Sequence, residues 1–351
     1  MTQITFVLPG YSREPIGGYK IVFMYANYLA KSHDVCILFL NSNALIHYPL
    51  PELIRVKAID LFTQQNPKWF KLNPKIKKIS ARNKKYLYSL KDTDIVIATA
   101  ATTVNFVKRH FNSAKKFYLI QDFENWDIDD KELYATYSLG FRNIVVSQWL
   151  KEIVDEYSDR PSAYIRNPID TQKYIINNPI SNRDPYTVGM LYHTRPTKGS
   201  KYSLEAIKQA KRFYPELKVE MFGACPPPDA LPEWITYFEN ASQDRTIRIY
   251  NDISIFINGT IEEGFGLTGL EAMACGAALV STNYLGVKEY AVDRKNALLS
   301  PVKDSTALSK NLQILFDNDD LRQTLANNGN KTAQSFSLDN AYKEFESIIL
   351  S

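Results

Sequence analysis

The sequence predicts an α/β protein with two doubly wound, Rossmann-like domains that face each other across a cleft. Short apolar runs alternate with helical patterns along the whole chain, as expected for parallel sheets covered by helices. The 351 residues are too many for one ordinary core and suit two domains. The alternation breaks after Arg166-Asn167-Pro168 and restarts beyond a turn-rich link that ends at Asp184-Pro185. Because ligands bind beyond the carboxyl ends of parallel strands, the cleft is expected at those ends.

The first half of the chain contains five candidate strands, each a short and mostly apolar run bounded by turn residues. They are expected over 4–8, 35–40, 95–98, 116–120 and 143–146. A helix over 19–32 follows a link that contains Gly17-Gly18, and a second helix over 148–157 follows the last of these strands.

The second half repeats the pattern and adds helices at its end. Strands are expected over 187–191, 217–222, 235–238, 253–257, 278–282 and 297–299. Helices are expected over 203–213, 243–250, 267–275, 287–292, 306–317, 319–335 and 338–350.

Composition narrows the class of protein. Apolar residues make up 45% and aromatic residues 13%, which is typical of a globular domain. The three cysteines are widely spaced and form no disulfide or metal pattern, which favours a reducing compartment. The start of the chain lacks the basic region and cleavage site of a signal peptide, and no run approaches the roughly 18 apolar residues of a membrane span. We therefore expect a cytoplasmic protein.

The most specific motif is the stretch EEGFGLTGLEAMACG, in which Glu263 and Glu271 stand eight positions apart around a glycine-rich turn. Gly264 and Gly266 would let backbone amides approach a ligand, and the N-terminus of the following helix, expected over 267–275, favours a phosphate. A carboxylate accepts two hydrogen bonds from a vicinal diol. The stretch therefore predicts a diphosphate held between two hydroxyl-bearing groups, as in a nucleotide sugar. The alternative is a surface turn before a small-residue helix that packs on a sheet.

This stretch closely resembles the E-x7-E signature of the retaining family 4 glycosyltransferases, which have the GT-B fold. The resemblance implies that Glu263 holds hydroxyls of the sugar and that Glu271 holds those of the ribose. The other residues that it assigns to donor binding lie in the turn and the first helical turn after it: Gly264, Phe265, Gly266, Leu267 and Thr268.

The resemblance covers nearly the whole chain and also implies how the domains are divided. The final helix is expected to cross back onto the first domain, as in GT-B enzymes. The expected acceptor domain is therefore 1–165 together with 337–351, and the expected nucleotide-sugar domain is 166–336.

The loop after the predicted strand 187–191 carries Arg195 and Lys198 ahead of a helix. Two cations at such a junction would face the cleft and neutralise a diphosphate leaving group. In the family, an Arg and a Lys of this loop hold the diphosphate. Lys198 is followed by a glycine, as in the family, but Met190 replaces the Arg that follows the strand glycine, so we transfer that role to Arg195. The alternative is a pair of ordinary surface cations.

Two positions of the first domain resemble donor or acceptor contacts of the family. Gly17-Gly18 is similar to the glycine pair that lets the first helix approach the sugar and diphosphate, although any tight turn could use such a pair. The segment QDFENWD follows a predicted strand and so lies at the cleft edge. It resembles a QDFE stretch of bacterial polysaccharide-assembly transferases. Asp122 is the expected contact there, with a solvated loop acid as the alternative.

No metal site is expected. Asp127-Ile128-Asp129 has the D-x-D form of metal-dependent transferases, but it lies at the start of a probable helix, where acids are favoured, and no His or Cys cluster joins it. The four histidines are scattered and form no catalytic triad. We expect no cofactor, only the substrate nucleotide sugar.

One segment of the first half is strongly basic. Residues 61–91 contain nine Lys or Arg and no acid, with aromatic and aliphatic residues between them. This composition is typical of an amphipathic segment on an anionic membrane, and it fits a solvated helix face above a normal core equally well. The first interpretation would bring the protein to the inner face of the plasma membrane. No nucleic-acid motif accompanies the segment, and we expect no nucleic-acid partner.

The sequence thus predicts a retaining, metal-independent glycosyltransferase that moves a hexosyl group from a nucleoside diphosphate sugar to a saccharide acceptor. The acceptor would be a growing polysaccharide or glycan, free or lipid-linked. Retention is implied by the resemblance. A UDP-hexose such as UDP-glucose is the favoured donor, and a dTDP-rhamnose-type deoxyhexosyl donor is the alternative. An epimerase, a phosphorylase or a non-catalytic nucleotide-sugar-binding partner would share the architecture.

Overall fold

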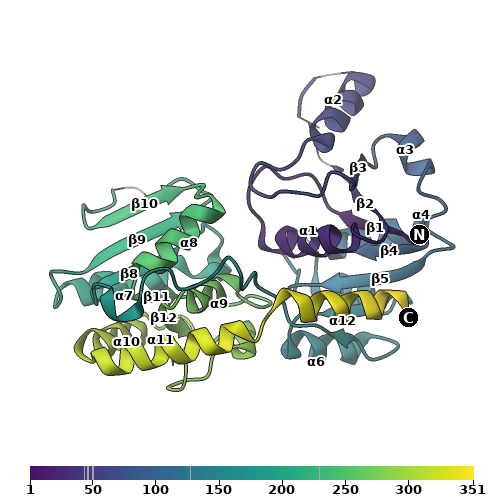
Figure 1. The fold of residues 1–351 in the computed structure, drawn as a ribbon. Helices are drawn as coiled ribbons and strands as arrows, with labels where there is room; N and C mark the ends of the chain where they lie inside the picture. Colours follow the sequence, from purple (N-terminus) through teal and green to yellow (C-terminus); the bar gives the residue numbers. More distant parts are fainter. Residues whose placement is uncertain (43, 46, 50, 127, 229) are drawn as a thin grey trace. The chain divides into compact units, whose positions relative to one another are not determined.

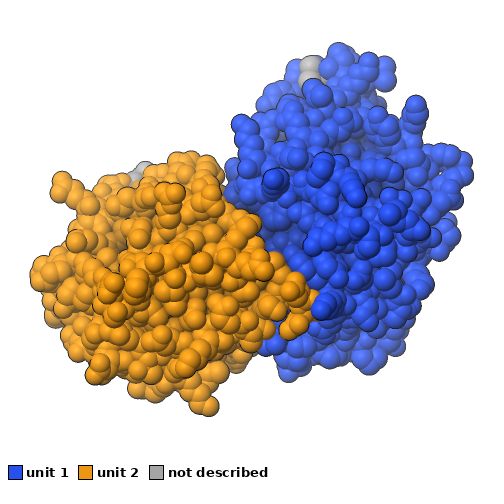
Figure 2. Space-filling view, viewed as in Figure 1, with its two compact units in different colours: residues 1–166, 342–351 blue, residues 167–341 orange. Residues whose placement is uncertain are grey.

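The computed structural model describes all residues except 43, 46, 50, 127 and 229 (Figure 1). The chain forms two compact units, which are coloured separately in Figure 2. Unit 1 comprises Met1–Arg166 with Tyr342–Ser351, and unit 2 comprises Asn167–Ala341. Each unit contains one sheet whose strand pairs are all parallel, with helices packed against it. The predicted fold class, two Rossmann-like α/β sheets, is confirmed.

Unit 1 has a seven-stranded sheet of order β3-β2-β1-β4-β5-β6-β7. The strands are β1 Gln3–Leu8, β2 Asp34–Phe39, β3 Lys77–Ser80, β4 Ile95–Ala98, β5 Lys115–Ile120, β6 Arg142–Val145 and β7 Ala163–Tyr164. The inner strands are buried almost continuously, as expected for a sheet covered on both faces. The strand order reverses between β1 and β4, and the loops that follow these two strands therefore diverge at the carboxyl edge.

Helices surround this sheet, and the end of the chain is one of them. The helices are α1 Gly17–Leu29, α2 Glu52–Gln64, α3 Lys84–Tyr88, α4 Ala101–His110, α5 Asp130–Tyr137, α6 Gln148–Tyr157 and the unit 1 part of α12 Leu338–Leu350. Aromatic stacking fixes α12 to α1: the rings of Phe345 and Tyr25 lie 4.0 Å apart, and those of Tyr342 and Tyr28 lie 4.6 Å apart. The last ten residues thus complete the core of unit 1.

Unit 2 has a six-stranded sheet of order β10-β9-β8-β11-β12-β13. The strands are β8 Thr187–Leu191, β9 Lys218–Gly223, β10 Ile235–Glu239, β11 Ile255–Asn258, β12 Ala278–Thr282 and β13 Ala297–Ser300. The helices are α7 Ser200–Lys211, α8 Gln243–Asp252, α9 Leu267–Ala274, α10 Ser305–Asp317 and α11 Asp319–Gln334, with 3-10 turns η1 Ile180–Asn182, η2 Pro196–Lys198 and η3 Leu285–Glu289.

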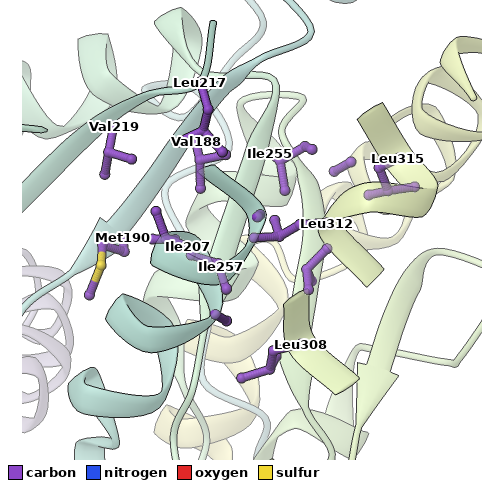
Figure 3. Packing of buried hydrophobic residues seen from close by; sticks show 14 of the residues in the cluster. Val188, Met190, Ile207, Leu217, Val219, Ile255, Ile257, Leu308, Leu312 and Leu315 are labelled. Atoms are coloured by element: carbon purple, nitrogen blue, oxygen red, sulfur yellow. The ribbon is translucent and has the colours of Figure 1, made fainter. Parts of the chain in front are cut away.

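The core of unit 2 lies between the sheet and the helices α7 and α10 (Figure 3). It is built from residues of the central strands and of these helices, among them Val188, Met190, Ile207, Ile255, Ile257, Leu308, Leu312 and Leu315. These side chains are at most 2% exposed. Their packing fixes β8 and β11 side by side, and therefore fixes where the loops after these strands begin.

Several predicted elements differ from the structure. The helix expected over 287–292 is the 3-10 turn η3, which begins two residues earlier. The strand β3 and the helices α2, α3 and α4 were not predicted as elements, whereas the helix expected to start at Asp127-Ile128-Asp129 is α5. The strand β3 holds one apolar residue in the sequence KKIS, so it carries little of the alternating pattern that marks a strand.

The basic segment 61–91 is not a single helix, so the solvated helix face that was one interpretation of it does not describe the segment as a whole. It runs from the last turn of α2 through a loop, β3 and α3. The rings of Trp69 and Phe70 each lie 5.5 Å from that of Phe23, and Leu72 and Ile76 are buried. Leu72 and Ile76 thus belong to the core of unit 1 and the partly buried Trp69 and Phe70 pack at its edge, whereas most of the lysines between them are exposed.

Candidate active site

Two side chains that the sequence selects as candidates meet at the point where the strand order of unit 2 reverses. The neighbouring strands β8 and β11 lead to loops that carry Lys198 and Glu263, respectively. Lys198 Nζ lies 2.6 Å from Glu263 Oε1, and the two side chains are 18% and 22% exposed. A charge-assisted bond of this length orients both groups. Ligands of doubly wound sheets bind at this kind of position.

Close backbone contacts hold the loop after β8 against the loop after β11. Gly199 has φ +59°, and a Cβ atom there would lie 1.8 Å from the carbonyl oxygen of Gly259. The N–H of Ile261 donates to the carbonyl of Thr197 at 2.8 Å. The loop after β8 therefore lies directly against the loop after β11, and the backbone holds Lys198 opposite Glu263.

The glycine-rich turn rests on two buried tyrosines. Gly266 has φ +90°, and a Cβ atom there would lie 1.8 Å from Tyr284 Oη. Tyr290 Oη donates to the carbonyl of Gly266 at 2.7 Å and lies 3.2 Å from Tyr284 Oη. Phe265 is buried beside them. Only glycine fits at position 266, and the tyrosine pair determines where α9 begins.

The N-terminus of α9 is suited to an anion. The first amides of a helix have no partner within it, and the N-cap residue of α9, Gly266, has no side chain to cap them. Leu267 and Thr268, which the sequence assigns to donor binding, are the first two residues of the helix and are partly exposed. Backbone donors and the helix dipole therefore point outward one turn after Glu263.

Glu271 lies inside unit 2. It is 5% exposed, and Tyr250 of α8 donates to its Oε2 at 3.4 Å. Burial raises the pKa of Tyr250 well above its usual value, so the phenol remains a neutral donor. The carboxylate is thereby held in a fixed position on α9.

His193 is a residue of this region that sequence reasoning passed over. Its ring Nδ1 accepts from the backbone N–H of Arg195 at 2.9 Å, and the backbone N–H of His193 donates to Ser200 Oγ at 2.9 Å. Burial, followed by the charges of Lys198 and Arg195, lowers the pKa of His193. The imidazole is therefore neutral at pH 7 and carries its proton on Nε2. In the sequence, the position of His193 between a predicted strand and two cations was the signal that could have selected it.

The remaining predicted residues belong to unit 1. Gly17 and Gly18 begin α1, and Gln121 Nε2 donates to the carbonyl of Gly18 at 3.1 Å. Asp122 is half-buried, and its Oδ1 accepts from the N–H of Phe123 at 3.0 Å. The sequence analysis did not select Glu124, whose Oε2 accepts from the N–H of Ala101, the first residue of α4, at 2.6 Å.

Comparison with known proteins gives the family. The model of glycosyl transferases group 1 matches residues 172–332, which contain β8 to β13 together with Glu263 and Glu271. This part of the chain belongs to the group 1 glycosyltransferases. The resemblance predicted from the E-x7-E stretch is confirmed: the chain is related to bacterial capsular and exopolysaccharide glycosyltransferases.

Individual relatives agree with this family and with the GT-B fold. An uncharacterized glycosyltransferase of Methanocaldococcus jannaschii is 24% identical over 58% of this chain and 63% of its own length. The capsular polysaccharide biosynthesis glycosyltransferase CapM of Staphylococcus aureus is 29% identical over 29% of this chain and 27% of its own length. The alignments thus span less than two thirds of these relatives. The Anabaena protein HepE, solved with UDP-glucose, superposes with a TM-score of 0.76 and 14% identity over 99% of both chains.

The structure adds two observations, one on metals and one on membranes. Among the described residues, no group of three or more His, Cys, Asp or Glu side chains could hold a metal ion. Asp127 of the D-x-D triplet lies outside the described residues, and Asp129 accepts from the N–H of Glu132 at 2.8 Å as the N-cap of α5. In the same described part of the chain, no helix is long and apolar enough to cross a membrane.

Proposed function

We propose that this protein is a retaining glycosyltransferase that transfers a hexosyl group from a nucleoside diphosphate sugar to a saccharide acceptor. The observation that carries the proposal is the Lys198–Glu263 ion pair at the switch point of the unit 2 sheet, beside the uncapped N-terminus of α9. This arrangement offers a cation and backbone donors to a diphosphate, and a carboxylate to the hydroxyls of a sugar.

The chemistry assigned to these residues is electrostatic. When the bond between the sugar and the diphosphate breaks, negative charge grows on the leaving phosphate oxygens. Lys198, Arg195 and the amides at the start of α9 stabilise that charge without having to reorganise, because the two loops hold each other in place. The proposal therefore assigns no step to a metal ion.

The two glutamates have different roles in this scheme. Glu263 orients Lys198 before the donor arrives and then accepts hydrogen bonds from the sugar hydroxyls. Glu271, fixed by burial and by Tyr250, accepts from the ribose hydroxyls. Retention follows if the acceptor hydroxyl attacks on the face that the diphosphate leaves and gives its proton to the departing phosphate. That route requires no protein nucleophile.

The donor is proposed to be a UDP-hexose, and the acceptor a saccharide, free or lipid-linked, in polysaccharide assembly. The donor is supported by the fold of HepE, which was solved with UDP-glucose, and the acceptor by the name of CapM. Unit 1 is proposed to bind the acceptor or the donor sugar through Gly17, Gly18 and Asp122.

A panel of nucleotide sugars tests this function. The protein is incubated with UDP-hexoses and dTDP-rhamnose, with and without glycan acceptors, and the released nucleoside diphosphate and the sugar products are measured. Release from a UDP-hexose that Lys198→Ala abolishes supports the proposal. Release from dTDP-rhamnose alone supports a deoxyhexosyl donor. Binding without turnover would identify a non-catalytic partner, and a changed sugar on an intact nucleotide would identify an epimerase.

A further inference from the structure

The helix α2 of unit 1 carries apolar side chains on its solvent side. Leu53, Ile54 and Leu61 are 79%, 52% and 64% exposed, whereas the buried residues of the helix are Ile59 and Thr63. Leu53 and Leu61 are eight positions apart and lie on the same face. An ordinary surface helix turns its polar face outward. We call the face that carries Leu53, Ile54 and Leu61 the outer face of α2; none of the described residues covers these three side chains.

The surroundings of this face are strongly basic. Residues 52–91 contain eleven Lys or Arg and two acids. Both acids are engaged within the same region, since Glu52 lies 4.0 Å from Arg82 and Asp60 accepts a hydrogen bond from Asn83 Nδ2. Lys57 on α2 is exposed, as are Lys84 and Lys85 on α3. The positive charge is therefore available to a partner.

Two exposed tyrosines of α3 extend the same surface. Tyr86 and Tyr88 are 39% and 68% exposed, and Lys91 Nζ lies 4.8 Å over the ring of Tyr88. Asn83, the N-cap of α3, is bonded to Asp60 of α2, and both helices contact β3. The two helices thus flank one edge strand, and α2 projects from unit 1 at the top of the view (Figure 1). Tyrosine is favoured at membrane–water interfaces, because its ring is apolar and its hydroxyl is polar.

The exposed apolar side chains and the basic charge together indicate which partner would cover this surface. A second copy of the chain would bring the same basic surface to itself across a two-fold axis, and like charges would oppose that contact. A bilayer with acidic lipids satisfies both features, because its headgroups attract the lysines and its acyl boundary accepts a projecting row of aliphatic side chains. We propose that the outer face of α2, together with α3, docks this protein on an anionic membrane surface.

This proposal replaces the continuous segment 61–91 with a different set of residues. Trp69 and Phe70, the aromatic residues of that segment that could have entered a membrane, are partly buried and pack against Phe23 of unit 1. Leu53 and Ile54, which lie outside the segment, provide the apolar contact instead. The inference concerns unit 1 alone and does not depend on the transfer reaction.

Sedimentation with vesicles tests the docking. The full chain should bind vesicles of phosphatidylcholine and phosphatidylglycerol at low salt, bind phosphatidylcholine alone far more weakly, and be released as salt rises. The triple variant L53S/I54S/L61S should bind at least about 1,000-fold more weakly, since each buried aliphatic side chain contributes roughly tenfold or more. The variant K84Q/K85Q should lose about 25-fold, since each lysine near an acidic surface contributes about fivefold.

A matched control uses an exposed aromatic residue of unit 2. Phe213 is 70% exposed, so Phe213→Ser removes apolar surface of similar size away from α2 and should leave vesicle binding unchanged. The replaced residues of α2 and α3 are exposed, and circular dichroism should show that every variant keeps its fold. Donor hydrolysis in solution should be the same in all of them. Loss of vesicle binding can therefore be distinguished from loss of transferase activity.

Three results would overturn the inference. The wild-type protein could ignore acidic vesicles at low salt, or the triple variant could bind them as the wild type does. Light scattering could instead show that the wild type self-associates and that the triple variant does not. In that last case the outer face of α2 is a contact between copies of the chain.

Discussion

Replacing Lys198 with alanine should separate catalysis from folding. The Lys198–Glu263 pair is about one-fifth exposed, so its loss should reduce the free energy of unfolding by roughly 1–2 kcal/mol, between the values for surface and buried pairs. Removing one preorganised donor to a developing charge costs about 2.7–4 kcal/mol, or 100- to 1,000-fold in kcat. The variant should therefore remain folded and lose nearly all turnover.

Two quantities are measured for each variant, kcat and the donor Kd. Release of nucleoside diphosphate from a UDP-hexose gives kcat, and calorimetric titration with the same donor gives its Kd. The donor Kd should weaken by less than about tenfold, because the charge that Lys198 meets is larger in the transition state than in the bound donor. A matched control is Lys218→Ala, which removes an exposed pair with Asp184 at 3.5 Å in the same unit and should change neither value.

Equal losses in kcat and donor affinity would refute this reasoning. They would mean that Lys198 binds the diphosphate equally well before and during the reaction, and so contributes affinity but not rate. A collapse of the melting transition would refute it in a different way, by showing that the ion pair holds the fold.

Four further predictions follow from the same region. Glu271→Ala should weaken binding of nucleoside diphosphates by about 1.5–3 kcal/mol in a thermal-shift titration, and unchanged binding would exclude the ribose role. Gly266→Ala should lower both the melting temperature and turnover, because its Cβ would collide with Tyr284 Oη; wild-type values would show that the turn can shift. EDTA should leave turnover unchanged, and a loss that Mg²⁺ or Mn²⁺ restores would contradict that. The pKa of His193 is lowered in the folded state, so below about pH 6.5 the unfolded chain binds the extra proton and stability falls; His193→Gln should reduce this loss in melting scans.

The sequence predicted the strands and helices that bury a continuous apolar run or a clear helical face. The ranges expected for β4, β8, β12, α6 and α12 agree with the structure. The edge strand β3 was missed because three of its four residues are polar. The helix α2 was missed because its apolar residues lie on both its exposed and its buried sides, so that they do not form the single stripe that marks a helix covering a core. Both misses lie around the surface that we propose docks on a membrane.

The candidate site was predictable where sequence spacing and sheet topology act together. Lys198 and Glu263 follow two strands that the fold class makes neighbours, and the structure pairs them. The support beneath the site was not predictable in this way. Tyr290 reaches the turn at Gly266 from 24 positions along the chain, and nothing in the local pattern marks that contact. The glutamate of QDFE that bonds to α4 was passed over in favour of its neighbour Asp122, because spacing does not show which acid turns toward a helix.

The glycines of the site hold its two loops in place through contacts within the chain. Gly199 lies against the Gly259 carbonyl, and Gly266 lies against the Tyr284 hydroxyl. A side chain at either glycine would collide with the oxygen atom beside it, so these contacts fix the position of each loop. Loops fixed by such contacts change little when a ligand arrives, and the cost of ordering Lys198 and Glu263 is met during folding. A preorganised cation is also what stabilises charge in a transition state most effectively. The same contacts that make these positions intolerant of alanine therefore support a catalytic role for Lys198 over a role in binding alone.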